Sequence, residues 1–494
     1  MALAWWAYST GLHLQTEHLQ PSETISEGER TTMPRPNIVF IMADDMGYGD
    51  FGRFNNGLTE SPALDQLSTD GLCLTQHYSA SCVCTPARAS LLTGRYPHRT
   101  GAIEMRSTRG LDRLALREVT VADAFKRGGY TTGLVGKWHT GVYGAEYHPN
   151  RRGFDEFIGF RGGGMNYYDW LIERNGQYQR PTGQYLTDLL TDEAVEFLRR
   201  HRQAPFFLSV HYNAPHTPLE APDADIARFI DPARFTRGVS MVYAMIRCMD
   251  RGLARIRAEL LRLGLAENTL LLFTSDNGPA MYGAGDDCMA RFNCNFAGGK
   301  GSVYEGGIRV PMLLHWPAAG MTGGRTVAEF AHFTDWLPTL CAAAQVAPPA
   351  NVRLDGQNLL PVLRDGKSQE NPRRFWQWNR YSPVGDCNAA MRDGDWKLVR
   401  PIIAKAMWTA PEEMALDRDW EMHPEHFVDI LRTPEPPRQL PPAPPPELYN
   451  IAADPEEKNN LAPAHPDRVH RMLQNLETWF EDVEADRRSA PRTA

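Results

Sequence analysis

Short apolar runs alternate with helical patterns between residue 36 and about residue 344. Runs of apolar and β-branched residues predict buried strands, and they stand at residues 37–42, 131–135, 206–211, 269–274 and 309–316. Between them, apolar residues recur every three to four positions, as in helices that bury one face, at residues 119–127, 186–200 and 239–263. Because strands and helices alternate, we predict an α/β fold with a large, mostly parallel mixed sheet flanked by helices.

The pattern changes after about residue 360. Short antiparallel strands are predicted at residues 375–379, 388–392 and 396–400, with a hairpin turn at Asp393-Gly394. A Pro-rich linker at residues 434–446 is expected to be extended. A final amphipathic helix, which we expect to pack on the small sheet, carries Val469, Met472, Leu473, Leu476, Trp479, Phe480 and Val483 on one face. We therefore predict an α/β domain over residues 34–360 and a smaller α+β subdomain over residues 361–494.

Charge and composition exclude several classes of protein. The chain has 52 Lys and Arg against 60 Asp and Glu, and this net charge of −8 argues against nucleic-acid binding. No run of about 18 apolar residues occurs, so no membrane-spanning helix is predicted. The 8 cysteines are too few and too scattered for a disulfide scaffold.

The N-terminal residues lack the basic start of a secretory signal, because no Lys or Arg precedes Arg30. We expect residues 1–33 to be a disordered extension, with Met33 as an alternative natural start. The expected location is cytoplasmic, and a periplasmic or secreted location stays open.

Acidic and amide side chains follow two predicted strands. Asp44 and Asp45 come after residues 37–42, and Asp276 and Asn277 come after residues 269–274. Alone, each pair is an ordinary cap or turn signal. Because the carboxyl ends of parallel strands meet at one edge of a sheet, we expect these oxygens to lie together. Such a cluster favours Ca²⁺, with Mg²⁺ as second choice, and disfavours zinc.

Basic side chains mark three further strand ends or loops. Lys137 and His139 follow residues 131–135, His216 follows residues 206–211, and Lys300 lies in a Gly-rich loop. Taken singly, these are a surface lysine, a rigid turn and a weak loop signal. We interpret them as parts of one site because every one of the strand ends carries an ionisable or amide group.

Cys84 is a second candidate centre. Thr85 as an N-cap predicts a helix over residues 86–92, with Cys84 beside its free N–H groups. Arg88 follows one turn later and can reach Cys84. Three interpretations stay open: a structural thiol, a metal site shared with Cys82 that lacks a second cysteine pair, and a nucleophile.

Eight ordered motifs resemble those of the type I sulfatases, which are arylsulfatase-like members of the alkaline-phosphatase-like superfamily. The signature is Cys84-Thr85-Pro86-Ala87-Arg88, in which Ala87 stands where many members have Ser. The other motifs cover most of the chain and lie at residues 36–45, 136–139, 214–216, 275–278, 299–300, 394–398 and 447–450.

This resemblance implies a sulfuric ester hydrolase. It implies that a formylglycine-generating enzyme oxidises Cys84 to Cα-formylglycine, and that one hydroxyl of its hydrate attacks the sulfur of a sulfate ester. A covalent sulfo-enzyme then releases sulfate as the aldehyde re-forms. The ligands implied for one Ca²⁺ are Asp44, Asp45, Cys84, Asp276 and Asn277.

The resemblance also implies the roles of the remaining residues. Asp276 accepts the proton of the nucleophile, and Arg88 and Lys137 orient the hydrate. His139 is the base that releases sulfate. His216 and Lys300 face the bridging ester oxygen, with His216 as the acid for the leaving group.

Two other functions remain open at this point. A phosphonate monoester or phosphodiester hydrolase would share the signature and the metal site, and a non-catalytic binding protein would share the fold. The stretch Trp376, Trp378 and Arg380 and the loop at residues 162–170 are candidates for the entrance of the site. The identity of the sulfate ester, aryl or carbohydrate, and the oligomeric state are not readable from these patterns.

Overall fold

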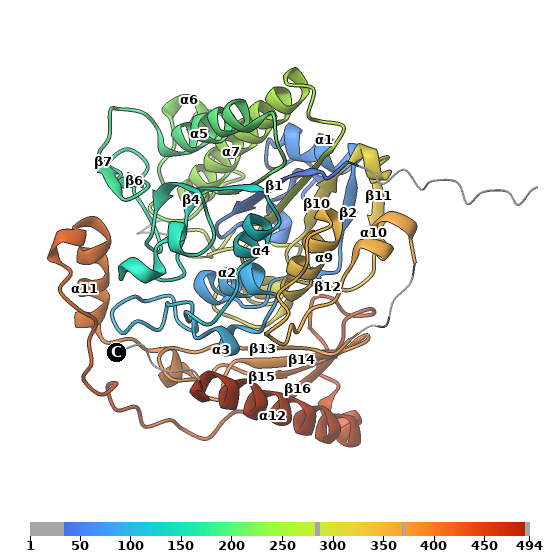
Figure 1. The fold of residues 1–494 in the computed structure, drawn as a ribbon. Coiled ribbons are helices and arrows are strands. Elements are labelled where there is room, and N and C mark those ends of the chain that lie inside the picture. Colours follow the sequence, from blue (N-terminus) through green and yellow to red (C-terminus); the bar gives the residue numbers. More distant parts are fainter. Residues whose placement is uncertain (1–33, 282–286, 368–369, 371, 490–494) are drawn as a thin grey trace, which may run out of the picture. The chain divides into compact units, whose positions relative to one another are not determined.

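A mixed sheet of ten strands forms the centre of the fold, in the order β11-β2-β10-β9-β1-β8-β4-β5-β6-β7 (Figure 1). The computed structural model describes residues 34–281, 287–367, 370 and 372–489, so the prediction for residues 1–33 lies outside them. Five neighbouring parallel strands are β9 (Thr269–Ser275), β1 (Asn37–Ala43), β8 (Phe206–His211), β4 (Thr131–Lys137) and β5 (Glu156–Phe160). Their near-complete burial agrees with a sheet covered on both faces.

The outer strands make the sheet mixed. On one side lie β10 (Met312–His315), β2 (Leu72–Leu74) and β11 (Arg325–Val327), and on the other lie β6 (Ile172–Arg174) and β7 (Gln177–Gln179). β10 runs antiparallel to both of its neighbours. It is shorter than the predicted strand at residues 309–316 because Pro311, which has no N–H to donate to a ladder, directly precedes it.

Helices cover both faces of this sheet (Figure 1). On one face lie α1 (Pro62–Asp70), α5 (Leu186–His201) and α7 (Arg237–Arg262); on the other lie α2 (Cys84–Thr93), α4 (Val121–Arg127) and α9 (Trp336–Ala344). Neighbouring residues of β8 show the alternation, since Phe206 contacts Phe197 of α5 and Phe207 contacts Phe125 of α4. The predicted α/β class is therefore confirmed. The remaining short elements of this part are β3 (His77–Tyr78), β12 (Ala331–His332), α3 (Pro97–Thr100), α6 (Asp223–Ile226), α8 (Glu305–Ile308) and α10 (Leu360–Asp365).

A four-stranded antiparallel sheet follows in the chain, with a long helix packed on it. The strands are β13 (Arg374–Gln377), β14 (Ala389–Asp393), β15 (Trp396–Arg400) and β16 (Glu447–Asn450), and the helix is α12 (Pro466–Ser489). Gly394, at φ 60°, forms the predicted turn between β14 and β15. Trp479 of α12 stacks on Phe375 of β13 with ring centroids 5.2 Å apart. The small sheet and its helix are thus confirmed, whereas the strand β16 was not predicted.

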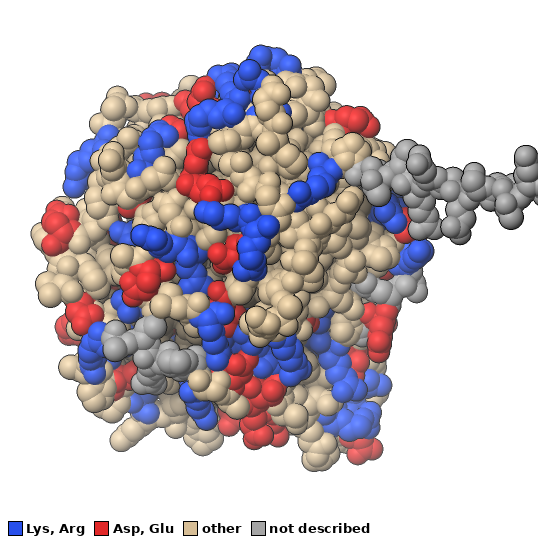
Figure 2. Space-filling model, viewed as in Figure 1, with Lys and Arg blue, Asp and Glu red and all other residues tan. Residues whose placement is uncertain are grey.

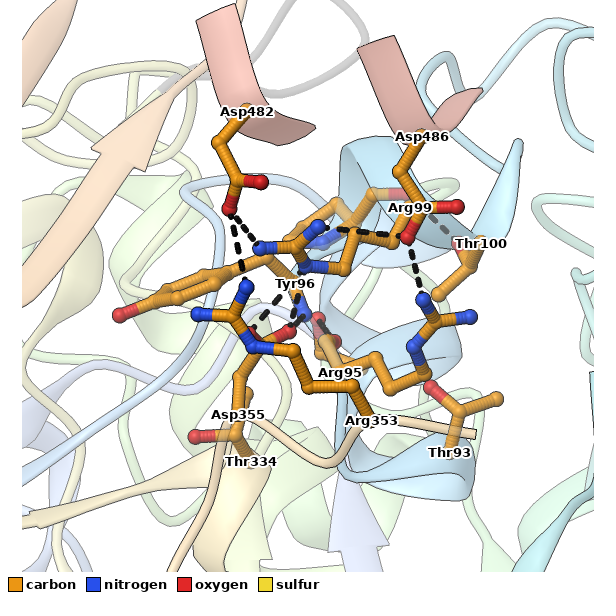
Figure 3. A network of polar contacts seen from close by, with 12 residues as sticks. Thr93, Arg95, Tyr96, Arg99, Thr100, Thr334, Arg353, Asp355, Asp482 and Asp486 are labelled. Carbon is orange, nitrogen blue, oxygen red and sulfur yellow. Dashed lines mark hydrogen bonds and ion pairs between the residues drawn. The ribbon is translucent and has the colours of Figure 1, made fainter. Parts of the chain in front are cut away.

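A network of ion pairs holds α12 against the segment that follows α2 (Figure 3). The nearly buried Arg99 donates to Asp355 at 3.1 Å, contacts Asp482, and lies 3.2 Å from Asp486. Arg95 also contacts Asp486. Because hydrogen bonds between ionised groups are strong and directional, this network fixes the small sheet's helix to the layer that carries Cys84.

Both sheets belong to one compact unit that begins at Arg35. The division near residue 360 stays a prediction. All eight cysteines are free and seven are buried, in agreement with the expectation of no disulfide scaffold. Among the described residues, no helix combines the length and apolar character needed to span a membrane.

Candidate active site

The predicted acidic residues meet at the carboxyl ends of neighbouring strands. Asp44 and Asp45 directly follow β1, and Asp276 and Asn277 directly follow β9, which pairs with β1 in parallel. Each of the three aspartates offers an oxygen within 4.8 Å of the others, and all three side chains are buried. The structure therefore brings together residues that are 231 positions apart in the chain.

Hydrogen bonds between the two strand ends fix the acidic cluster. The Asp45 backbone, at φ 64°, donates its N–H to Asp276 Oδ1 at 3.2 Å. Asn277 Nδ2 donates to Asp45 Oδ1 at 2.8 Å. A left-handed backbone at a non-glycine residue is strained, and here it turns the Asp45 side chain toward the neighbouring strand end.

Each aspartate is paired with its own cation. Arg88 donates through Nε and Nη2 to Asp276 Oδ2 at 2.9 and 2.7 Å. Lys137 Nζ, at the end of β4, donates to Asp44 Oδ2 at 2.6 Å. Lys300 Nζ donates to Asp45 Oδ2 at 2.8 Å. The predicted basic residues thus lie around the acidic cluster, and they offset its negative charge.

These ion pairs divide the aspartates by their pKa. Burial raises the pKa of Asp44 to about 7, against the lowering effect of Lys137. Burial is the largest effect on the other two and also acts to raise their pKa. Lys300, His216 and Asn277 together outweigh it at Asp45, and Arg88, Lys137 and Lys300 together outweigh it at Asp276, so both pKa values are lowered. Three carboxylates this close repel one another, which acts to raise their pKa values. The neighbouring Lys and Arg side chains offset this repulsion at Asp45 and Asp276.

Two oxygens of the cluster are buried without a hydrogen-bond partner in the described part of the chain, Asp44 Oδ1 and Asn277 Oδ1. A buried acceptor left unpaired costs roughly 1–3 kcal/mol. An oxygen-preferring divalent cation would satisfy both atoms. The acidic cluster and these two oxygens together fit a metal site.

Cys84 lies in the first turn of α2, beside the acidic cluster. The helix begins at Cys84 with Val83 as its N-cap, so the prediction of Thr85 as the N-cap is wrong. The extended backbone of Val83 (φ −144°) ends the preceding segment one residue before Cys84. The Sγ atom of Cys84 lies within 4.8 Å of an oxygen of Asp44 and a nitrogen of His216.

The chemistry of Cys84 narrows its interpretation. Burial raises the pKa of its thiol to about 11 although Lys137 and Lys300 lower it, so an unmodified Cys84 is protonated at neutral pH and is a poor nucleophile. Cys82 is also buried, and its Sγ lies 3.8 Å from Asn388 Nδ2, next to β14. The two sulfurs are therefore in different surroundings, which disfavours a metal site shared by Cys82 and Cys84.

Two histidines complete the site. His139 Nε2 lies 2.9 Å from the Met105 carbonyl oxygen, and its Nδ1 is buried with no partner among residues whose placement is described. His216 Nδ1 lies 2.6 Å from the Thr217 carbonyl oxygen, and Nε2 lies 3.7 Å from Asp45 Oδ2. Burial, reinforced by Lys137 at His139 and Lys300 at His216, lowers both pKa values, that of His216 to about 3. In each ring, one nitrogen is left without a hydrogen bond to the described backbone.

These groups open onto a cavity of about 610 Å³. Its inner lining includes Asp45, Cys84, His139, His216 and Lys300. The outer lining comes from the loop after β5 and from the helix α11 (Pro411–Met422). A cavity of this volume accommodates one or two sugar rings or a fused ring system.

Comparison with known proteins identifies the family. Residues 36–346 match the family model described as Sulfatase. The chain belongs to the sulfatase family. A second model, described as the C-terminal part of N-sulphoglucosamine sulphohydrolase, matches residues 299–425 of this sulfatase. The resemblance inferred from the eight motifs is therefore confirmed.

Individual relatives agree with this assignment. The sulfatase is 32% identical over 545 residues to steryl-sulfatase of Mus musculus, covering 93% of this chain and 84% of that protein. It is 33% identical over 371 residues to N-acetylgalactosamine-6-sulfatase of Homo sapiens, covering 69% and 68%. The crystal structure of Ps i-CgsB in complex with k-i-k-neocarrahexaose matches at a TM-score of 0.75 and 31% identity, over 90% and 93% of the two chains. This sulfatase is accordingly an enzyme that hydrolyses sulfate esters.

Sequence reasoning missed two polar groups that support the site. Arg291 donates to the Asp45 carbonyl oxygen at 2.9 Å and forms a buried ion pair with Asp50. His211, the last residue of β8, places Nδ1 3.0 Å from the Lys137 carbonyl oxygen. The sequence could have indicated His211, because it is an ionisable residue at the end of a predicted strand. Arg291 belongs to no periodic element, and no local signal marks it in the sulfatase sequence.

The helix α11 was also missed. Its Asp417, Arg418 and Glu421 line the cavity, and Leu416 and Trp420 pack on Tyr143 and Phe427. The signal in the sequence was the four-residue spacing of Leu416 and Trp420, which is typical of a helix with one buried face.

Proposed function

We propose that this sulfatase cleaves monoesters of aryl or carbohydrate type, with residue 84 present as Cα-formylglycine and one Ca²⁺ bound by Asp44, Asp45, residue 84, Asp276 and Asn277. The observation that carries the proposal is the approach of Cys84 Sγ to Asp44 and His216 within 4.8 Å. A formylglycine-generating enzyme in the same host is the partner that this proposal requires.

The donor atoms fit the two groups. The carboxylate oxygens, together with Asp44 Oδ1 and Asn277 Oδ1, which accept no hydrogen bond from the described residues, suit Ca²⁺, with Mg²⁺ as second choice. When bound, the cation would polarise the sulfuryl oxygens and lower the pKa of a nearby hydroxyl group. Formylglycine would supply the nucleophilic hydroxyl group that the protonated thiol of Cys84 does not.

The chain's own residues then orient the reacting groups. Arg88 holds the Asp276 carboxylate through two hydrogen bonds, so that its other oxygen, Oδ1, is turned toward the cluster. Asp276 is our candidate to accept the proton of the nucleophile. Lys137 Nζ and Arg88 Nη2 lie 2.6 and 3.7 Å from oxygens of Asp44, which fixes the positions of the two cations beside residue 84.

The leaving-group side is formed by His216 and Lys300, which both line the cavity. His216 uses Nδ1 for the Thr217 carbonyl, so Nε2 is the nitrogen for the ester oxygen. Because its lowered pKa leaves Nε2 unprotonated in the free enzyme, His216 becomes the acid for the leaving group when the negative charge of a bound sulfate ester raises that pKa. His139 uses Nε2 for the Met105 carbonyl, so Nδ1 is free to accept the proton whose loss releases sulfate. Loss of one positive contact to the sulfuryl group is expected to raise the barrier by roughly 2–4 kcal/mol.

Parallel assays test sulfate monoester cleavage against the phosphonate alternative. We expect kcat/KM for 4-nitrophenyl sulfate to be at least about tenfold higher than kcat/KM for a phenyl phosphonate monoester. A phosphonate replaces one non-bridging oxygen by an apolar carbon group, which would leave one buried donor unpaired. A higher kcat/KM for the phosphonate would favour the phosphonate hydrolase. The rate of background hydrolysis is measured with the Cys84→Ala protein and subtracted.

A further inference from the structure

One face of α11 forms a wall of the cavity. Met414, Arg418 and Met422 recur every four residues on this face, and all three line the cavity. The opposite side of the helix is packed, with the Trp420 ring 5.1 Å from that of Phe427. The helix therefore presents a defined set of side chains to whatever occupies the cavity.

Ion pairs fix this wall in place. Asp417 accepts hydrogen bonds from Ser107 N at 2.8 Å and from Arg106 Nη1 at 2.9 Å. Glu413 accepts hydrogen bonds from Arg109 Nε at 3.0 Å and from Arg109 Nη2 at 2.6 Å. Both acids are buried. Because Arg106, Ser107 and Arg109 anchor the helix, the positions of its cavity-facing side chains are defined by these contacts.

Three arginines line the cavity away from residue 84, and two of them, Arg380 and Arg418, are not bound to an acid of the lining, whereas Arg106 pairs with Asp417. Arg418 is exposed and forms no ion pair or hydrogen bond with the part of the chain that the structure describes. Arg380 donates to Glu104 at 2.6 Å, and its guanidinium lies 5.0 Å from the Trp378 ring centroid. Arg418 is thus exposed, and Arg380 is held by Glu104 and Trp378 with N–H groups left over.

The acids that line the cavity pair with neither arginine, and Glu104, the partner of Arg380, lies outside this lining. Asp45 pairs with Lys300, and Asp417 pairs with Arg106. Glu421 accepts the Gly163 N–H, and burial together with the Asp417 charge raises its pKa to about 7. The acids of the lining are therefore committed to other partners. Arg418 therefore offers an uncompensated positive charge, and Arg380 offers the guanidinium N–H groups that Glu104 does not use.

We propose that Arg380 and Arg418 form a second anion subsite in the outer part of the cavity, which selects saccharide sulfates that carry another acidic group, a carboxylate or a second sulfate. The inference rests on the proposed function, because it assumes that the scissile sulfate binds beside residue 84. Neutral aryl or steryl sulfates would contact only the Met side chains of the wall and would gain nothing from the two arginines.

Affinity tests the subsite separately from turnover. Calorimetric titrations use the calcium-loaded Cys84→Ala protein. The first pair of probes is the disaccharide of N-acetylgalactosamine 6-sulfate with glucuronic acid and the same disaccharide with glucose. The second pair is N-acetylgalactosamine 4,6-disulfate and the 6-sulfate. We expect the probe with the additional anion to bind about tenfold more tightly in one or both pairs, and the pair that responds identifies carboxylate or sulfate.

Variants assign that preference to the two arginines. In the Cys84→Ala protein, Arg418→Ala is expected to abolish most of the preference and to leave Tm unchanged. Arg380→Lys, which keeps a partner for Glu104, is expected to reduce it. Arg364→Ala on α10, which removes an exposed arginine that lines none of the described site, should retain the full preference.

Two results would contradict the second anion subsite. Equal affinities within both pairs, or a preference that survives in the Arg380→Lys/Arg418→Ala double variant, would overturn the subsite. Failure of the wild-type enzyme to hydrolyse 4-nitrophenyl sulfate would instead count against the proposed function, because the affinity ratios are measured without turnover.

Discussion

Replacement of Cys84 by Ala is expected to abolish turnover of 4-nitrophenyl sulfate while the fold stays intact. The nucleophile would be lost entirely, and loss of a covalent nucleophile lowers kcat by roughly 10⁴–10⁶-fold. The fold should tolerate the change because only one sulfur atom is removed from the first turn of α2, where the helix keeps its Val83 cap. Initial rates and far-UV circular dichroism of the two proteins measure both effects.

Two further variants make this result specific. Cys84→Ser is expected to release one equivalent of 4-nitrophenol and then to stop, because a serine sulfate ester has no second hydroxyl group with which to expel sulfate. Cys73→Ala removes another buried cysteine, in β2 and outside the site, and should retain near-normal turnover. Turnover by Cys84→Ala within tenfold of wild type would refute residue 84 as the nucleophile.

Removal of the metal is expected to abolish activity and to lower Tm. Two buried oxygens of the acidic cluster, Asp44 Oδ1 and Asn277 Oδ1, accept no hydrogen bond within the described part of the chain, and their pairing with a cation stabilises only the folded state. At a Ca²⁺ concentration of 100 times Kd, the added stability is about 2.7 kcal/mol. Activity and Tm are measured after treatment with a chelator, and again during titration with Ca²⁺ and Mg²⁺.

A variant of one proposed metal ligand separates stabilisation by bound Ca²⁺ from general stabilisation by salt. Asp44→Asn is expected to lose the Ca²⁺-dependent rise in Tm together with activity. Asp365→Asn, which removes an acid that pairs with Arg364 at the end of α10, should keep both. Full activity in the chelated enzyme, with an unchanged Tm, would rule out the metal site.

The strand ends were the most predictable part of the site. Asp44, Asp276 and Lys137 follow runs of apolar residues that are buried in neighbouring parallel strands, and that burial leaves a clear pattern in the sequence. The topology of such strands brings their carboxyl ends to one edge. The positions of these residues in the fold therefore follow from hydrophobic patterning alone, although their chemical roles required the family resemblance.

Other features depend on tertiary contacts that leave little local pattern. Val83 caps α2 although Thr85 has the better side chain for a cap, because the extended chain before Cys84 decides where the helix begins. Arg291 supports Asp45 from a segment without periodicity. Arg418 belongs to a helix whose position over the cavity is set by partners more than 300 residues away, such as Ser107 with Asp417.

The most direct test of the central claim is the mass of the tryptic peptide over residues 54–88, taken from enzyme that its native host has matured and that is active on 4-nitrophenyl sulfate. An aldehyde at residue 84, in a fraction that rises in proportion to specific activity across preparations, is the predicted result. An intact thiol at residue 84 in a fully active preparation would contradict the chemistry proposed for this sulfatase.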